Sequence, residues 1–145
     1  MEIKRLTIHL KSYSDNTAFS KIIVQRDGVY LVSVLPWGDM ESDLPKLVAP
    51  RRSADEILRY AESLRIKRKS LTIENPEVQD GAEVSFLFEY DLARPVHFVL
   101  VNSFTPDLLA VAVFVCKRIK EGKVIVDFLS HWKKVANNRN KLLDN

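Results

Sequence analysis

The feature that most constrains the fold is a turn signal near the start of the chain, Arg26-Asp27-Gly28. It separates two short runs, residues 20–25 and 29–35, that are rich in Ile, Val and Tyr. These residue types favour strands, and an Asp-Gly pair between two such runs is the strongest short-range signal of a β-hairpin. The sequence therefore predicts two antiparallel strands here, and a sheet against which the rest of the chain must pack.

Other segments carry the two-residue period of half-buried strands. Residues 2–11 alternate between apolar and polar side chains, with one slip near Lys4 and Arg5. The loop 36–52 contains several prolines, and a loop of this length is either functional or holds an extra short strand. Residues 44–49 are the candidate for that strand, on a sheet edge where Pro is tolerated. Further strands are predicted at Leu71–Glu74, Ala82–Tyr90 and 96–102.

Two stretches have the spacing of amphipathic helices. The first opens at Ser53-Ala54-Asp55-Glu56, a capping box in which Ser53 bonds the amide three residues later and Glu56 reaches back. The second, residues 124–143, gathers nine apolar residues on one stripe. Its length of about six turns is enough to cross one face of a sheet.

The segment 106–120 supports two interpretations. Thr105-Pro106-Asp107 is a good helix start, with Thr as the cap and Pro at the first helical position. However, residues 108–116 are apolar on every side, with Val at alternate positions, which suits a central strand. We favour the strand and keep a buried helix over 106–120 as the alternative.

These elements predict an α+β protein with a single compact domain over residues 1–145. A chain of 145 residues buries roughly two thirds of its unfolded surface, which is enough for one core. The predicted order is βββα-ββββα, around an antiparallel or mixed sheet with two main helices. If residues 106–120 are helical, the helices number three. Helices gathered on one face of the sheet are the economical packing.

Composition excludes several classes of protein. A hydrophobic fraction of 46% and a charged fraction of 28% are globular values and exclude disorder of the whole chain. One Cys and four Gly exclude a disulfide scaffold, a Cys-based zinc module and a Gly-rich phosphate loop. The residues His9, His97 and His131 are scattered, without metal-ligand spacing or a neighbouring nucleophile. We therefore predict no catalytic residue, no metal and no cofactor.

The sequence also bears on location. No stretch is apolar for long enough to cross a bilayer, and the first residues lack the pattern of a signal peptide. We predict an intracellular, cytoplasmic protein without a membrane partner.

The net charge of +3 conceals strong local imbalances. Residues 46–69 hold eight basic and three acidic residues, a balance of +5, and residues 117–145 hold the same numbers. Between them, residues 70–95 hold six acids and one Arg, a balance of −5. Such a polarised surface can steer an anionic partner, whereas the alternative interpretation is two solvated helix faces. Convergence of the two basic segments on one face favours the anionic partner.

The first functional hypothesis is a non-catalytic protein that engages nucleic acid through its backbone phosphates. Exposed aromatic side chains, Tyr60 or Trp37, would stack on bases. The candidate nucleic-acid-binding residues are Arg51, Arg52, Arg65, Lys67, Arg68, Lys69, Lys117, Arg118, Lys133, Lys134 and Lys141.

Two other hypotheses stay open. Apolar content and sheet edges that need covering favour a protein-interaction or self-associating module, such as a homodimer. Pro106-Asp107 followed by Glu121-Gly122-Lys123 has the form of a metal-dependent nuclease pattern, in which two acids hold the metal. The geometry argues against this pattern, because 14 helical residues would separate the two acids by about 20 Å.

Overall fold

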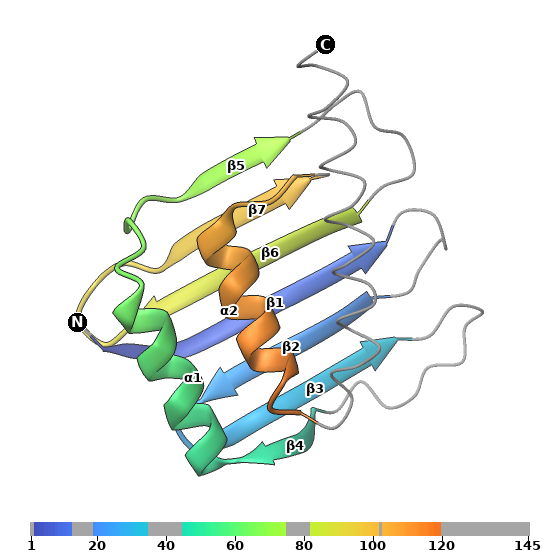
Figure 1. The fold of residues 1–145 in the computed structure, drawn as a ribbon, viewed down its shortest axis with the longest axis vertical. Helices are drawn as coiled ribbons and strands as arrows, with labels where there is room; N and C mark the ends of the chain where they lie inside the picture. Colours follow the sequence, from blue (N-terminus) through green and yellow to red (C-terminus); the bar gives the residue numbers. More distant parts are fainter. Residues whose placement is uncertain (1, 13–18, 35–44, 75–81, 102, 120–145) are drawn as a thin grey trace.

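The computed structural model describes residues 2–12, 19–34, 45–74, 82–101 and 103–119 (Figure 1). Within these residues the fold is α+β, as the sequence predicts. Four strands lead into a helix, and three more strands lead into a second helix. The elements are β1 (Ile3–Ser12), β2 (Phe19–Gln25), β3 (Gly28–Val34), β4 (Lys46–Pro50), α1 (Arg51–Ser63), β5 (Leu71–Glu74), β6 (Ala82–Tyr90), β7 (Val96–Val101) and α2 (Pro106–Cys116).

The strands form one sheet in the order β4-β3-β2-β1-β6-β7-β5. Every neighbouring pair is antiparallel except β5 and β7, which are parallel, so the sheet is mixed. The strands predicted from alternation are confirmed to within a few residues. The extra short strand considered for the loop 36–52 is present as β4 and lies on a sheet edge. Four strands therefore precede α1 and three follow it, instead of the predicted three and four, because residues 108–116 form α2 and not a strand.

The hairpin predicted around Asp27 and Gly28 is confirmed as β2 and β3, joined by Arg26 and Asp27, with Gln25 opposite Gly28. Gly28 also lies where β4 approaches β3. A Cβ atom there would stand 2.6 Å from Leu47 Cδ1 and 3.1 Å from the Ala49 carbonyl oxygen. A glycine at this position therefore allows the edge strand to pair closely with its neighbour.

The slip predicted in the first strand is also confirmed. The pairing of β1 with β6 shifts register between Ile3 and Arg5. The extra residue allows Ile3 and Leu6 to face the same side of the sheet, since successive side chains otherwise alternate. Both are buried in the core.

One face of the sheet carries both helices (Figure 1). Buried side chains from the six strands β1, β2, β3, β4, β6 and β7 and from both helices form one hydrophobic cluster. Phe86 and Phe88 are its largest fully buried side chains, and Phe88 meets Phe98 edge to face with ring centroids 5.9 Å apart. The core thus fixes α1 and α2 on the same side of the molecule.

The capping box predicted at Ser53 is wrong. α1 begins two residues earlier, at Arg51, directly after the last residue of β4. Pro50 is the N-cap, with a φ of −78° that suits proline in extended backbone, and no side chain among the described residues caps the helix. The helical spacing was predicted correctly, because Ala54, Ile57, Leu58 and Ala61 form the buried face.

The favoured strand over residues 108–116 is also wrong, and the helical alternative is correct as far as Cys116. α2 begins after Thr105, with Pro106 in the first turn as the helix-start signal indicated. Its buried side chains recur at helical spacing: Leu108, Val111, Ala112, Val115 and Cys116. The segment is apolar on more than one side because the helix contacts the core on one side and α1 on another. The helix predicted over residues 124–143 lies outside the described residues.

Candidate nucleic-acid interface

α1 and the loop after it form one connection between the two edge strands of the sheet. The chain leaves β4, passes along α1 across the sheet, and reaches β5 at the opposite edge (Figure 1). The two edge strands are separated by six strand spacings of about 4.8 Å, so this path is about 29 Å long. It carries seven exposed basic residues, here called the basic crossover: Arg51, Arg52, Arg59, Arg65, Lys67, Arg68 and Lys69.

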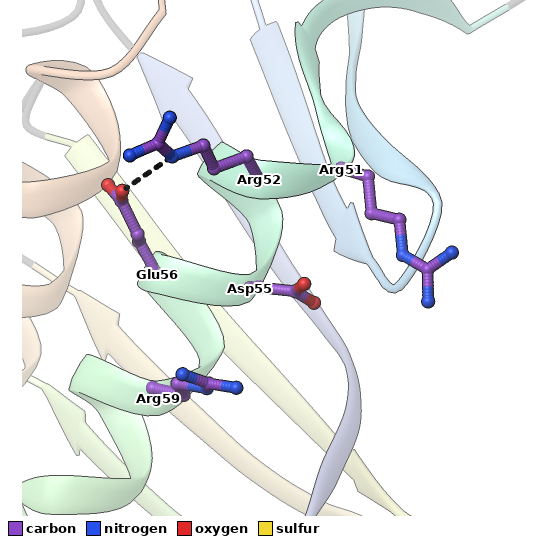
Figure 2. Close-up of a pocket in the computed structure, with 5 residues that line it drawn as sticks. All are labelled: Arg51, Arg52, Asp55, Glu56 and Arg59. Atoms are coloured by element: carbon purple, nitrogen blue, oxygen red, sulfur yellow. Dashed lines mark ion pairs between the residues drawn. The ribbon is translucent and has the colours of Figure 1, made fainter.

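The three cations of the basic crossover that lie on α1, Arg51, Arg52 and Arg59, form its helical half. They surround an open depression of about 500 Å³ (Figure 2). Its lining residues come from successive turns of α1: Arg51, Arg52, Asp55, Glu56 and Arg59. The side chain of Arg52 is 92% exposed and its Nε lies 3.9 Å from Glu56 Oε1. In Figure 2 Asp55 points away from this pair. Arg59 is absent from the candidates named above, although its position seven residues after Arg52 would have placed it on the same helix face.

Arg118, after the end of α2, joins this surface through a contact inside the fold. Its Nε lies 3.1 Å from Glu56 Oε2, and its Nη1 donates to the Phe114 carbonyl oxygen at 3.1 Å. The guanidinium carbon lies 3.3 Å from the centroid of the Phe114 ring. Arg118 therefore ties α2 to α1, and the neighbouring Lys117 is exposed beside it. The first basic segment and the described start of the second, Lys117 and Arg118, therefore meet at this point.

Tyr60 does not fulfil the role expected of it as an exposed stacking residue. Its ring stacks on Phe114 with centroids 4.1 Å apart and an interplanar angle of 5°. It therefore belongs to the contact between α1 and α2, and one of its faces is already occupied. Trp37, the other aromatic candidate, lies outside the described residues.

The four cations between α1 and β5 form the loop half of the basic crossover: Arg65, Lys67, Arg68 and Lys69. Arg65 adopts a φ of 50°, in the left-handed region that often terminates helices. Arg65 and Arg68 line a cavity of about 170 Å³ together with Glu62 and Tyr90. The guanidinium of Arg68 lies 5.8 Å from the Tyr90 ring centroid. Burial raises the pKa of Tyr90, and the charge of Arg68 opposes that rise.

The acidic residues of the crossover are largely engaged within the fold. Residues 51–69 contain seven basic and three acidic residues, a balance of +4. Glu56 pairs with Arg118 and Arg52, and Glu62 accepts a hydrogen bond of 2.9 Å from the Ile3 amide. The described residues show no ion pair for Arg51, Arg59, Arg65, Lys67 or Lys69, so these cations face solvent.

Of the predicted binding residues, eight lie on α1, in the loop after α1 or directly after α2. They are Arg51, Arg52, Arg65, Lys67, Arg68, Lys69, Lys117 and Arg118. The remaining three, Lys133, Lys134 and Lys141, lie outside the described residues.

Reactive groups elsewhere in the described part of the chain offer little chemistry. Burial raises the pKa of the Cys116 thiol to about 12, so the thiol stays protonated at neutral pH. Asp107 lies in the first turn of α2, and Glu121 lies outside the described residues. Among the residues that were placed, no three His, Cys, Asp or Glu side chains form a group that could hold a metal.

Neither of the two described helices is both long and apolar enough to cross a membrane. Comparison of the chain with protein-family models, with curated protein sequences and with solved structures finds no match.

Proposed function

We propose that this chain is a non-catalytic protein that binds nucleic acid through phosphate contacts from the basic crossover. The observation that carries the proposal is the placement of seven exposed cations along one edge-to-edge path, with a balance of +4. Lys117 adds a further exposed cation where α2 ends against α1. An anionic polymer is the partner that such an extended row of cations fits. The intracellular location predicted from the sequence suits this partner.

The dimensions of the basic crossover support a backbone contact. Phosphates of one strand in B-form DNA are spaced about 3.4 Å along the helix axis, so a path of about 29 Å runs beside about eight of them. Seven cations are comparable with that number. Phosphate contacts fix register and orientation but do not read sequence, so we propose binding with little sequence preference.

The test is fluorescence anisotropy of labelled double- and single-stranded oligonucleotides at low salt. A triple variant, Arg65→Gln, Lys67→Gln and Lys69→Gln, removes three cations from the loop half of the basic crossover. A matched control, Lys4→Gln, Lys21→Gln and Lys46→Gln, removes three exposed cations that lie outside the crossover. We expect the first triple variant to lose about tenfold or more in affinity and the control to lose much less, because only the first removes phosphate contacts.

Two results would overturn the proposal. The first is no detectable binding of either oligonucleotide by the wild-type chain at low salt. The second is an equal loss of affinity in the two triple variants, which would show that net charge alone matters. Circular dichroism of both variants confirms that each retains the fold.

A further inference from the structure

A small cavity lies where β1 begins and β6 ends, beside the last turn of α1 and the loop that follows it. Its volume is about 170 Å³. That is several times what one water molecule needs, and well below the volume of about 300 Å³ or more that encloses a drug-sized ligand. The cavity therefore has room for one small polyatomic group.

The end of α1 brings two guanidinium groups to this cavity. Arg65 has a φ of 50°, in the left-handed region that residues other than glycine rarely adopt. Its amide donates to the Glu62 carbonyl oxygen at 3.2 Å and so closes the last turn of the helix. Arg68, three residues later, lines the same cavity, with its guanidinium carbon 5.8 Å from the centroid of the Tyr90 ring. Two cations of the loop thus converge on one small space.

Tyr90 supplies an uncharged donor to the cavity. It lies opposite Ile3 in the pairing of β6 with β1 and two residues after the buried Phe88, so it faces the helix-bearing side of the sheet. Burial raises the pKa of Tyr90, so its hydroxyl keeps its proton at neutral pH. Among the described residues this hydroxyl has no hydrogen-bond partner, so it is available to donate to a ligand.

The charge of the lining is positive. Glu62 is the acid among the lining residues, and its Oε1 already accepts a hydrogen bond of 2.9 Å from the Ile3 amide. Arg65 and Arg68 oppose this single anion with two cations. The cavity is therefore suited to a small anion.

We propose that this cavity binds a phosphate monoester. Near neutral pH such a group carries a charge of about −1.5 to −2 and three strong acceptor oxygens. The guanidinium groups of Arg65 and Arg68 and the hydroxyl of Tyr90 provide donors for these three oxygens, and a guanidinium matches phosphate with two parallel hydrogen bonds. A carboxylate offers a smaller charge and one acceptor oxygen fewer. Because the ligand is a single group and not a polymer, the proposal does not depend on nucleic-acid binding.

The first test is a titration of the isotope-labelled chain with inorganic phosphate, followed by the chemical shifts of its backbone amides. Chloride at the same ionic strength is the reference. We expect saturable shifts centred on Arg65, Arg68 and Tyr90. Arg68→Gln should weaken the affinity for phosphate by about tenfold and Tyr90→Phe by less, because a hydrogen bond from a charged donor is the stronger one. Arg59→Gln removes an equal charge from α1 outside the cavity, so it is the matched control and should bind phosphate like the wild type.

Arg65→Gly separates binding from folding. Glycine adopts a φ of 50° without strain and is the residue that most often ends a helix in this conformation. The variant should therefore keep the wild-type stability in urea denaturation and still lose about tenfold in affinity for phosphate, because one guanidinium is gone. Unchanged affinity in this variant would contradict the proposal.

A second titration identifies the source of the phosphate group. Fluorescence anisotropy compares oligonucleotides with and without a terminal phosphate. A preference for the phosphorylated strand that Arg68→Gln abolishes and Arg59→Gln retains assigns the cavity to strand ends. Saturable binding of inorganic phosphate without such a preference assigns it to a small phosphorylated molecule, and both results support the proposal.

Two results would overturn it. The first is the absence of both effects, with neither saturable shifts in inorganic phosphate nor a preference for the phosphorylated strand. The second is an equal loss of phosphate affinity in Arg68→Gln and Arg59→Gln, which would show general charge attraction only. Either result leaves the contact of the basic crossover with internal phosphates to be judged by its own test.

Discussion

At the scale of single residues, Arg118 has the most specific set of contacts. It meets a carboxylate, a backbone carbonyl and an aromatic face at once, and its side chain is only 27% exposed. Its partner Glu56 is 49% exposed, so the ion pair alone contributes little, about 0–1 kcal/mol. The carbonyl hydrogen bond and the ring contact should supply most of its effect on stability.

We therefore expect Arg118→Ala to reduce the free energy of unfolding by about 1–2 kcal/mol. Glu56→Gln removes only the ion pair and should cost about 0–1 kcal/mol. Urea denaturation of the two variants measures the difference. Equal losses in both would show that the ion pair is the main contribution, contrary to this account.

His9 predicts a dependence of stability on pH. Burial lowers its pKa from the ordinary value of 6.5, Lys21 and Lys11 lower it further, and Glu83 opposes them. The folded chain therefore binds this proton less readily than the unfolded chain does. As the pH falls below about 6.5, the unfolded state is protonated first and stability is lost.

The pH dependence is measured as the free energy of unfolding at about pH 7.5 and about pH 5.5. The His9→Gln variant should lose less stability between these two values than the wild type. His97→Gln, at an exposed position on β7, is the control and should behave like the wild type. An unchanged pH dependence in His9→Gln would contradict the account.

At the scale of elements, the sequence signal and the structure start α1 at different residues. A working capping box at Ser53 would make Ser53→Ala cost about 1 kcal/mol. In the structure Ser53 lies inside the helix and Pro50 is the N-cap. We expect Ser53→Ala to change the free energy of unfolding by no more than a few tenths of a kcal/mol, measured by urea denaturation. A loss near the capping value would place the helix start at Ser53 after all.

The strands were predictable because their signal is local. Alternation with a period of two and the Asp27-Gly28 turn depend on neighbouring residues only, and even the slip near Lys4 could be read from the pattern. α2 was not predictable, because a helix that is apolar on every side has no periodic contrast. Its helical start at Thr105-Pro106 was the better guide, and the β-propensity of its valines was overridden by tertiary packing.

The candidate site was predictable in its parts but not in its assembly. The basic residues of the first segment were visible as a charge run, and their exposure followed from it. Their placement on one path depends on β4 and β5 being the two edges of the sheet, which long-range pairing determines. The engagement of Arg118 with Glu56, 62 residues apart in sequence, likewise depends on how the helices pack.

At the scale of the whole molecule, the basic crossover runs between the two edge strands of the sheet by way of α1 and the loop after it. Its cations therefore lie along one path only because the complete strand order places β4 and β5 at opposite edges. The central claim is that the basic crossover contacts phosphates.

The most direct test of that claim is the salt dependence of nucleic-acid affinity. Each phosphate neutralised on duplex DNA contributes about −0.9 to the slope of log Kobs against log salt concentration, so seven cations give a slope of up to about −6. Removing Arg65, Lys67 and Lys69 by substitution with Gln should make the slope shallower by up to about 2.7, whereas the control triple variant should keep the wild-type slope. A slope near zero in the wild type, or the same slope in all three proteins, would contradict the account.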